Sequence, residues 1–307
     1  MKKEGIKILV PFMIVGGIVS VFFINDMNIK KSTNEFTSEI NLEMIENPVQ
    51  QNDVPQYQYT QEKRNLEKAV DYTIADKSDV YHMMLNTIDY YNSVSGSIIR
   101  SDSANLINVI TFQTDLLNTK AYSKSGLHLI DDDKNISNIS LSDVDFDKIV
   151  YCADGLLTTV IDGSSETMKN AVTYLSDCSP IDDSKRISIA DDGYPICRYR
   201  QNPTNVPFAS ICLFPQEMAL GFLQDKKLWE ITGITKKDDL TCYVIEGKTN
   251  KSYGEKINAA TFKFLVDVNT GVLIQYEGFS ADGTLSDYMY TMDIKFNDNA
   301  KPVNVLG

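Results

Sequence analysis

The region from Thr261 to Phe296 constrains the fold of this 307-residue chain more than any other part. It reads TFKFLVDVNTGVLIQYEGFSADGTLSDYMYTMDIKF, with apolar and aromatic runs separated by Asn269-Thr270-Gly271 and Asp282-Gly283. Glycine at such positions supplies the positive φ that tight hairpin turns need. Alternate residues of the first run, Phe262 to Val266, are apolar, which is typical of a half-buried strand. The region therefore predicts successive strands joined by tight turns.

Several earlier segments extend this pattern. LWEITGI, from Leu228, and CYVIEG, from Cys242, are strand sequences. Residues 106–113 have a period of two, and KIVYCADGLLTTVI predicts a hairpin that turns at Ala153-Asp154-Gly155. Strands that follow one another through short turns form an antiparallel sheet. We expect one curved sheet of eight or more strands, with helices on its concave side.

Two segments have helical spacing instead. The first carries one apolar stripe, with Ser78 or Asp79 as its cap and Ser95-Gly96-Ser97 as its end. Its stripe residues are Val80, Met83, Met84, Ile88 and Tyr91. In the second, Pro215 suits the first turn of a helix that continues from Gln216 to Gln224. Residues 164–177 fit either a short helix or an extended loop.

The N-terminus predicts a membrane anchor over residues 1–25. Lys2, Lys3 and Lys7 precede an uncharged apolar run from Ile8 to Ile24, 17 residues long and at the short end of what spans a bilayer. Phe22 and Phe23 stand where a cleavage site needs small residues, so we expect an uncleaved anchor, with a cleaved signal peptide as the alternative. The early lysines place the N-terminus in the cytoplasm and the bulk of the chain outside.

Residues 26–60 are predicted to be a flexible polar tether. They are rich in Asn, Gln, Glu and Ser, contain Pro48 and Pro55, and have no sustained apolar period. Such sequences cannot bury enough apolar surface to offset the entropy of ordering. The folded domain is expected over residues 61–307.

The order of these segments carries a resemblance. PTNVPFASICLFPQEMALGFLQDKKLWEITGI, followed by CYVIEG and FKFLVDVNTGVLIQYEGFSADGTL, resembles the extracytoplasmic LolA/RseB lipoprotein-binding half-barrel superfamily. The resemblance implies an α+β fold, in which a single strongly curved antiparallel sheet wraps around helices, here preceded by a transmembrane helix. It also implies an apolar groove that holds a lipid, an acyl chain or a lipoprotein, and envelope signalling through a partner such as an anti-sigma factor. LolA is a free carrier, whereas this chain is predicted to be tethered.

Three residues are the candidates for the lining of such a groove. Met218 and Phe222 share one face of the Pro215 helix, and Phe112 lies on a predicted strand. Met is soft and adaptable, which suits variable acyl chains. The alternative for each residue is ordinary core packing. The corresponding alternative function is a structural or interaction protein of the cell envelope without a lipid ligand.

Other function classes find little support. A net charge of −13 argues against nucleic acid, which needs clustered Lys and Arg. We expect no enzyme, cofactor or metal site, because no nucleotide or nucleophile motif is present. His82 and His128, the two histidines, lie on different predicted elements. The loop from Asp131 lacks the Gly and the final acid of an EF-hand.

The cysteines leave their pairing open. The chain has five: Cys152, Cys178, Cys197, Cys212 and Cys242. An exterior location permits disulfides, and either Cys178–Cys197 or Cys197–Cys212 could close a loop. An odd number leaves at least one thiol free.

Overall fold

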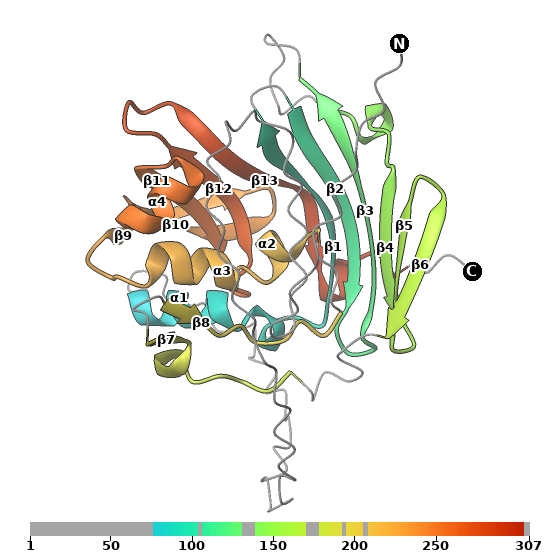
Figure 1. Ribbon diagram of the computed structural model, residues 1–307, viewed down its shortest axis with the longest axis horizontal. Coiled ribbons are helices and arrows are strands. Elements are labelled where there is room, and N and C mark those ends of the chain that lie inside the picture. Colours follow the sequence, from blue (N-terminus) through green and yellow to red (C-terminus); the bar gives the residue numbers. More distant parts are fainter. Residues whose placement is uncertain are drawn as a thin grey trace, which may run out of the picture. The chain divides into compact units, whose positions relative to one another are not determined.

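The computed structural model describes residues 76–103, 106–130, 139–169, 178–191, 195–204 and 208–303. Within them, eleven strands form one antiparallel sheet in the order β6-β5-β4-β3-β2-β1-β13-β12-β11-β10-β9 (Figure 1). The strands are β1 Ser93–Ser103, β2 Leu106–Asp115, β3 Lys120–Leu129, β4 Lys148–Ala153, β5 Leu156–Ile161, β6 Ser164–Lys169, β9 Trp229–Lys237, β10 Leu240–Lys248, β11 Thr261–Asp267, β12 Leu273–Phe279 and β13 Leu285–Phe296. The expected single antiparallel sheet is confirmed.

The last strand lies in the middle of the sheet. β13 pairs with β1, with Ile98 opposite Thr291, and also with β12, with Tyr276 opposite Met289. From this centre β1 to β6 follow in chain order to one edge, and β12 to β9 run in reverse order to the other. The two halves of the described chain are therefore joined along the β1–β13 pair.

The predicted turns lie between strands. Asp154 and Gly155 join β4 to β5 with φ of 53° and 72°, which is the left-handed backbone that hairpin turns use. Gly271 and Gly283 also have positive φ, 72° and 84°, between β11 and β12 and between β12 and β13. Residues 164–169, left open between helix and loop, form β6; residues 170–177 lie outside the described residues.

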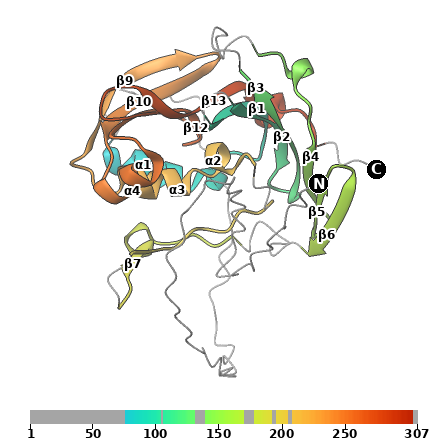
Figure 2. The ribbon, with the colours of Figure 1, turned by 45° about the horizontal axis from the view of Figure 1, so that its top comes forward.

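The α-helices and the π-helix lie on one face of the sheet. They are α1 Lys77–Leu85, α2 Ser210–Leu213, α3 Gln216–Met218, a π-helix Ala219–Leu223 and α4 Lys251–Ile257, with short 3₁₀ turns at Thr87–Asp89, Leu141–Asp143, Asp183–Lys185 and Asn297–Asn299. Figure 2 shows the sheet bending around this helical layer. A separate two-stranded hairpin, β7 Ile187–Ile189 with β8 Pro195–Cys197, lies outside the large sheet.

The first helix is shorter than the sequence predicts. α1 is capped by Asp76, whose carboxylate accepts from the Ser78 backbone N–H at 2.7 Å, and it ends at Leu85. The predicted end, Ser95-Gly96-Ser97, lies within β1 instead. A β-carbon at Gly96 would lie 3.0 Å from the Ile294 α-carbon, so glycine serves close strand packing there rather than helix termination. The predicted stripe is nevertheless buried as expected, from Val80 to Tyr91.

The main core fills the space between the sheet and the helices, and we call the helix-covered side of the sheet the inner face. Its buried members come from α1, α2, α3, the π-helix and strands β1, β2 and β9–β13. On the outer face a smaller cluster, Ile99, Ile107, Val109 and Val144, is covered by the segment 139–146. Among the described residues, no helix is both long and apolar enough to cross a bilayer. The predicted anchor and tether lie outside the described residues.

Candidate functional site

The apolar interior behind the inner face centres on Phe222. Its ring contacts four other aromatic rings, those of Tyr253, Phe262, Phe264 and Tyr276, at centroid distances of 4.9, 4.8, 5.0 and 5.5 Å. Each contact is edge-to-face, the arrangement that aromatic pairs favour. We call these five residues the aromatic cluster. It joins the π-helix to β11, β12 and α4.

The predicted helix after Pro215 forms, but half of it is a π-helix. Gln216–Met218 are α-helical, and Ala219–Leu223 have the wider π turn. π-Helices are rare and occur often at functional sites. This one places Phe222 in the aromatic cluster and Met218 beside it, where the Tyr253 hydroxyl lies 4.0 Å from the Met218 sulfur.

The short helix α4 closes the aromatic cluster from one end of the sheet. The Tyr253 ring packs on Gly221, where a β-carbon would approach the ring within 2.6 Å. Asn250 caps α4 by accepting from the Tyr253 N–H at 2.8 Å, and its side-chain amide donates to the Gly221 carbonyl at 2.9 Å. Tyr253 itself is half-buried. One turn of helix and one tyrosine therefore separate this part of the core from solvent.

All three predicted groove residues are core side chains in the structure. Phe112, Met218 and Phe222 expose 2%, 5% and 2% of their surface. Met218 and Phe222 lie together beneath Tyr253, whereas Phe112 packs farther along the sheet against Gly96 of β1. A ligand groove along them stays a prediction, and it requires that helices move apart from the sheet.

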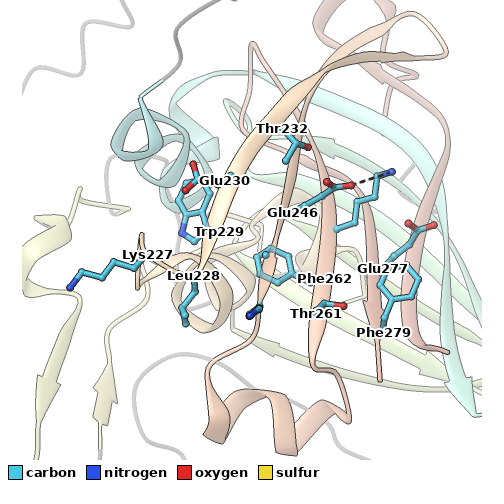
Figure 3. Close-up of a pocket in the computed structure, with 13 residues that line it drawn as sticks. Lys227, Leu228, Trp229, Glu230, Thr232, Glu246, Thr261, Phe262, Glu277 and Phe279 are labelled. Carbon is cyan, nitrogen blue, oxygen red and sulfur yellow. Dashed lines mark ion pairs between the residues drawn. The ribbon is translucent and has the colours of Figure 1, made fainter. Parts of the chain in front are cut away.

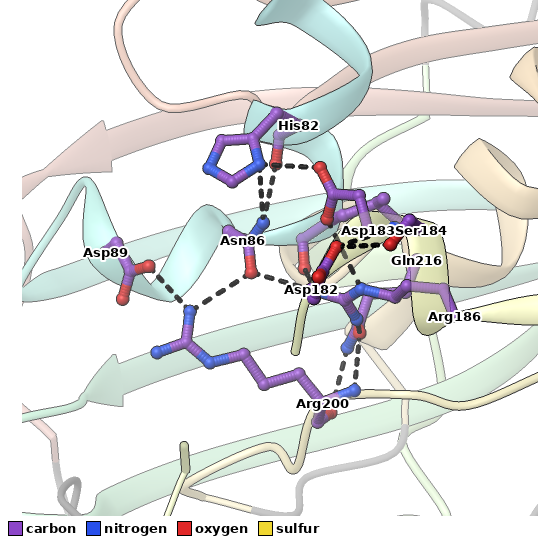
Figure 4. Close-up of polar contacts among 10 residues, drawn as sticks. His82, Asn86, Asp89, Asp182, Asp183, Ser184, Arg186, Arg200 and Gln216 are labelled. Atoms are coloured by element: carbon purple, nitrogen blue, oxygen red, sulfur yellow. Dashed lines mark hydrogen bonds and ion pairs between the residues drawn. The ribbon is translucent and has the colours of Figure 1, made fainter. Parts of the chain in front are cut away.

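A buried polar network ties the β7–β8 hairpin to the helices (Figure 4). Arg186, fully buried, donates to Gln216 Oε1 at 2.7 Å and to Asn86 Oδ1 at 2.8 Å. Arg200, 3% exposed, donates to Asp89 Oδ2 at 2.6 Å and to the Cys178 carbonyl at 2.8 Å. We call these residues the arginine clamp. Shared acceptors hold both guanidinium groups, so the clamp fixes the hairpin against α1 and α3.

His82 belongs to the rim of the arginine clamp. Its Nδ1 lies 2.7 Å from Asp183 Oδ2, and Asp183 Oδ1 forms an ion pair with Arg186 Nε at 3.5 Å, too long for a hydrogen bond. Burial lowers the pKa of Arg186, and Asp183 partly opposes that shift. The sequence gives no sign of this network, because its members lie far apart along the chain; Asn86 and Arg200, for example, are 114 residues apart.

An open depression of about 790 Å³ lies over β9–β12 (Figure 3). Much of its lining is charged side chains of the outer face, where Lys263 pairs with Glu246 at 3.8 Å and Glu277 follows on the next strand. Glu230 and Glu246 lie directly opposite each other. None of the three predicted groove residues, Phe112, Met218 and Phe222, lines this depression, so it is not the predicted groove.

The cysteines and possible metal ligands are the remaining candidates. None of the five cysteines forms a disulfide in the structure, so neither expected loop-closing bond is present. Burial raises the pKa of Cys212, and burial with nearby Asp267 raises that of Cys242 to about 12, so neither is a reactive thiolate. Within the described residues, no group of three His, Cys, Asp or Glu side chains could hold a metal ion.

Comparisons with known proteins give matches among solved structures. No protein-family model and no curated protein matches the sequence. A chain in the complex of Pseudomonas aeruginosa MucA and MucB is 13% identical, with a TM-score of 0.39; the match covers 74% of this chain and only 59% of that one. LprF from Mycobacterium bovis is 8% identical at a TM-score of 0.34, over 73% of this chain and 98% of its own.

A LolA superfamily protein from Nitrosomonas europaea is also similar. It is 8% identical at a TM-score of 0.21, over 73% of this chain and 95% of its own.

Proposed function

We propose that this chain is a membrane-tethered extracytoplasmic binding or sensory domain that holds a lipid, an acyl chain or a lipoprotein against the inner face of its sheet. The observation that carries the proposal is the aromatic cluster with Met218, an apolar interior that one turn of α4 separates from solvent.

The inner face supplies a path toward this interior. Leu127 and Leu129 lie on the inner face of β3, opposite and beyond Asn108 of β2, and expose 45% and 72% of their surface. An apolar chain would lie along these leucines and reach Met218 and Phe222 when Tyr253 moves aside. Burial of each methylene contributes about 0.8 kcal/mol. A chain of about ten methylenes therefore offers roughly 8 kcal/mol against the loss of the Tyr253 contacts.

A sensory role would connect this binding to a protein partner. The arginine clamp fixes the β7–β8 hairpin to the same helices that cover the interior. A ligand that separates the helices from the sheet would move the hairpin too. The partner that the sequence resemblance implies is an envelope protein such as an anti-sigma factor.

Native mass spectrometry of the full chain tests the binding role. The chain is expressed in a bacterial host, extracted, transferred to amphipol and sprayed intact. We expect a bound species with the mass of a fatty acid or a lipid, and its displacement by added cis-parinaric acid. A chain that carries no lipid and does not bind cis-parinaric acid would overturn the proposal.

A second candidate function has its own observation. The three predicted groove residues are at least 95% buried among the chain's own side chains, which suits an envelope interaction protein that needs no lipid. Capture of a defined envelope protein by the full chain, together with no bound lipid, would favour this alternative.

Tethering is tested separately. We expect the intact mass of the membrane-extracted chain to include residues 1–25, and a protease added outside spheroplasts to remove the folded part. A mature chain that begins near residue 25 would replace the anchor with a cleaved signal peptide.

A further inference from the structure

One row of inner-face residues crosses the central strands at the end of the sheet where α4 lies. In register, Tyr276 of β12 lies opposite Met289 of β13, Met289 opposite Arg100 of β1, Arg100 opposite Asn108 of β2, and Asn108 opposite Leu127 of β3. We call these five residues the rim row. Its strands lie side by side in Figure 1. The row begins at the aromatic cluster, through Tyr276, and ends at exposed Leu127.

The polar groups of the rim row make no hydrogen bonds of normal geometry among the described residues. Tyr276 is 1% exposed, and its hydroxyl makes no such bond, although the Asp287 carboxylate lies close enough to raise the pKa of that hydroxyl. The buried Oδ1 of Asn108 is also unpaired. Arg100 is exposed, and its guanidinium forms neither an ion pair nor a hydrogen bond within the described part of the chain. More than nine in ten buried polar groups in folded proteins are paired. Two unpaired buried atoms beside a free guanidinium indicate a place for a ligand.

The charges around the row favour a single negative charge. Burial raises the pKa of Tyr276 and that of Tyr253, so both hydroxyls remain protonated donors at neutral pH. Asp287 and Arg100 are the charged groups that act on both tyrosines. Asp287 lies two residues before Met289 on the same strand face, and it accepts a hydrogen bond from the Ser101 hydroxyl. One guanidinium with one carboxylate nearby disfavours a doubly charged ligand.

We propose that Arg100 and Tyr276 bind the head of an anionic amphiphile, a carboxylate or a phosphodiester, whose chain lies on the inner face. This inference rests on the lipid-binding function proposed above and specifies its ligand class. Arg100 supplies charge-assisted hydrogen bonds, the Tyr276 hydroxyl supplies a buried donor, and the adjoining aromatic cluster receives the chain. Asp287 limits the head to one negative charge.

The test compares two probes that differ only in head charge. Binding of cis-parinaric acid and of its neutral methyl ester is measured by fluorescence with the full chain in amphipol. Because a charge-assisted hydrogen bond is worth roughly a tenfold change in affinity or more, we expect the acid to bind about tenfold more tightly than the ester. Competition by lysophosphatidylglycerol and by palmitate then distinguishes a phosphodiester head from a carboxylate.

Variants separate binding of the charged head by Arg100 and Tyr276, which we call the head site, from binding of the apolar chain by the aromatic cluster, which we call the chain site. Arg100→Gln should weaken the acid about tenfold and leave the ester unchanged. The control Arg198→Gln removes the same charge from an exposed position in the loop after β8 and should bind as the unmodified chain does. Tyr276→Phe removes a hydroxyl that makes no hydrogen bond of normal geometry within the described residues, so the fold should keep its melting temperature while affinity for the acid falls several-fold. Asp287→Asn should strengthen binding of the acid.

The outcomes distinguish this inference from the function on which it rests. If the ester binds and the acid shows no preference, or if Arg100→Gln binds the acid as the unmodified chain does, the head site is wrong and the chain site stands. If neither probe binds, the lipid-binding function fails and the head site fails with it. If Tyr276→Phe binds the acid as tightly as the unmodified chain does, Tyr276 is not part of the head site.

Discussion

Gly271 lies directly against the backbone of Met83 in α1. A β-carbon at position 271 would come within 2.6 Å of the Met83 carbonyl carbon and oxygen, and Gly271 also has a φ of 72°. We therefore expect Gly271→Ala to lower the free energy of unfolding by about 2–4 kcal/mol, from left-handed backbone strain plus displacement of α1. Urea unfolding followed by circular dichroism measures this.

Gly283 is the matched control for that variant. Its φ of 84° is similar, but no atom lies within 4 Å of where its β-carbon would be. Gly283→Ala should lower the free energy of unfolding by only about 1 kcal/mol, from left-handed backbone strain alone. Equal losses for the two variants would show that contact with α1 contributes nothing.

The carboxyl group of Asp267 should make stability depend on pH. It is 1% exposed, its Oδ2 accepts from the Thr270 N–H and hydroxyl, and burial raises its pKa. Because its pKa is raised in the folded state, the Asp267 carboxyl group contributes stability that is fully present below the unfolded-state pKa near 3.9. That stability is lost as the pH rises through the folded-state pKa. The free energy of unfolding should therefore fall from about pH 4 upward.

Asp267→Asn removes the titrating group but keeps an acceptor for Thr270. Its free energy of unfolding, measured by urea titration at successive pH values, should change less between pH 4 and 7 than that of the unmodified chain. Parallel curves for the two proteins would assign the pH dependence to other groups.

Loss of Arg200 should destabilise the domain strongly. Arg200→Met removes the buried donor to Asp89 Oδ2 and to the Cys178 carbonyl, whereas Asn86 Oδ1 still accepts from Arg186. We expect a loss of about 2–4 kcal/mol, reduced from the value for a fully buried pair because the Asp89 side chain is 27% exposed. Exposed Arg198 is the control, and Arg198→Met should change stability by less than about 0.5 kcal/mol. Chemical denaturation measures the free energy of unfolding of both variants. Similar small decreases for the two would contradict a structural role for the arginine clamp.

Gly221→Ala should displace α4 without unfolding the core. The new methyl group would meet the Tyr253 ring, a side chain that can swing toward solvent. Hydrogen exchange should accelerate at residues 253–257 while the amides of β11 and β12 stay protected. Gly233→Ala in β9 has no atom within 4 Å and serves as the control. Unchanged exchange at α4 would mean that Tyr253 does not close the aromatic cluster.

The sheet was predictable because strand and turn signals are local. Asp154-Gly155, Gly271 and Gly283 each fix a turn from adjacent residues, and strand periods follow between them. The end of α1 was not predictable in the same way. Gly96 allows a close contact with Ile294, which lies almost 200 residues away, and no local pattern contains such a contact. Burial of Met218 and Phe222 followed from helical spacing, but spacing cannot distinguish a filled core from a groove.

The site residues missed by sequence reasoning share one cause. Arg100, Asn108 and Tyr276 become neighbours through pairings of β1 with β2 and of β13 with β1 and β12. The period of two over residues 106–113 predicts that Asn108 shares a strand face with Phe112, which is confirmed, but nothing in the sequence places Arg100 beside Tyr276. The signal that could have drawn attention to them is polar residues at inward-facing positions of strands.

The position of β13 also has a consequence for synthesis. β1 is an interior strand of the sheet, and the partner on its second side, β13, is the last of the described strands to be synthesised. Until then β1 presents an unsatisfied row of backbone groups, and the first six strands form a ribbon with two open edges. A circular permutant that begins at β9 and joins β13 directly to β1 would make that pairing local and should fold faster.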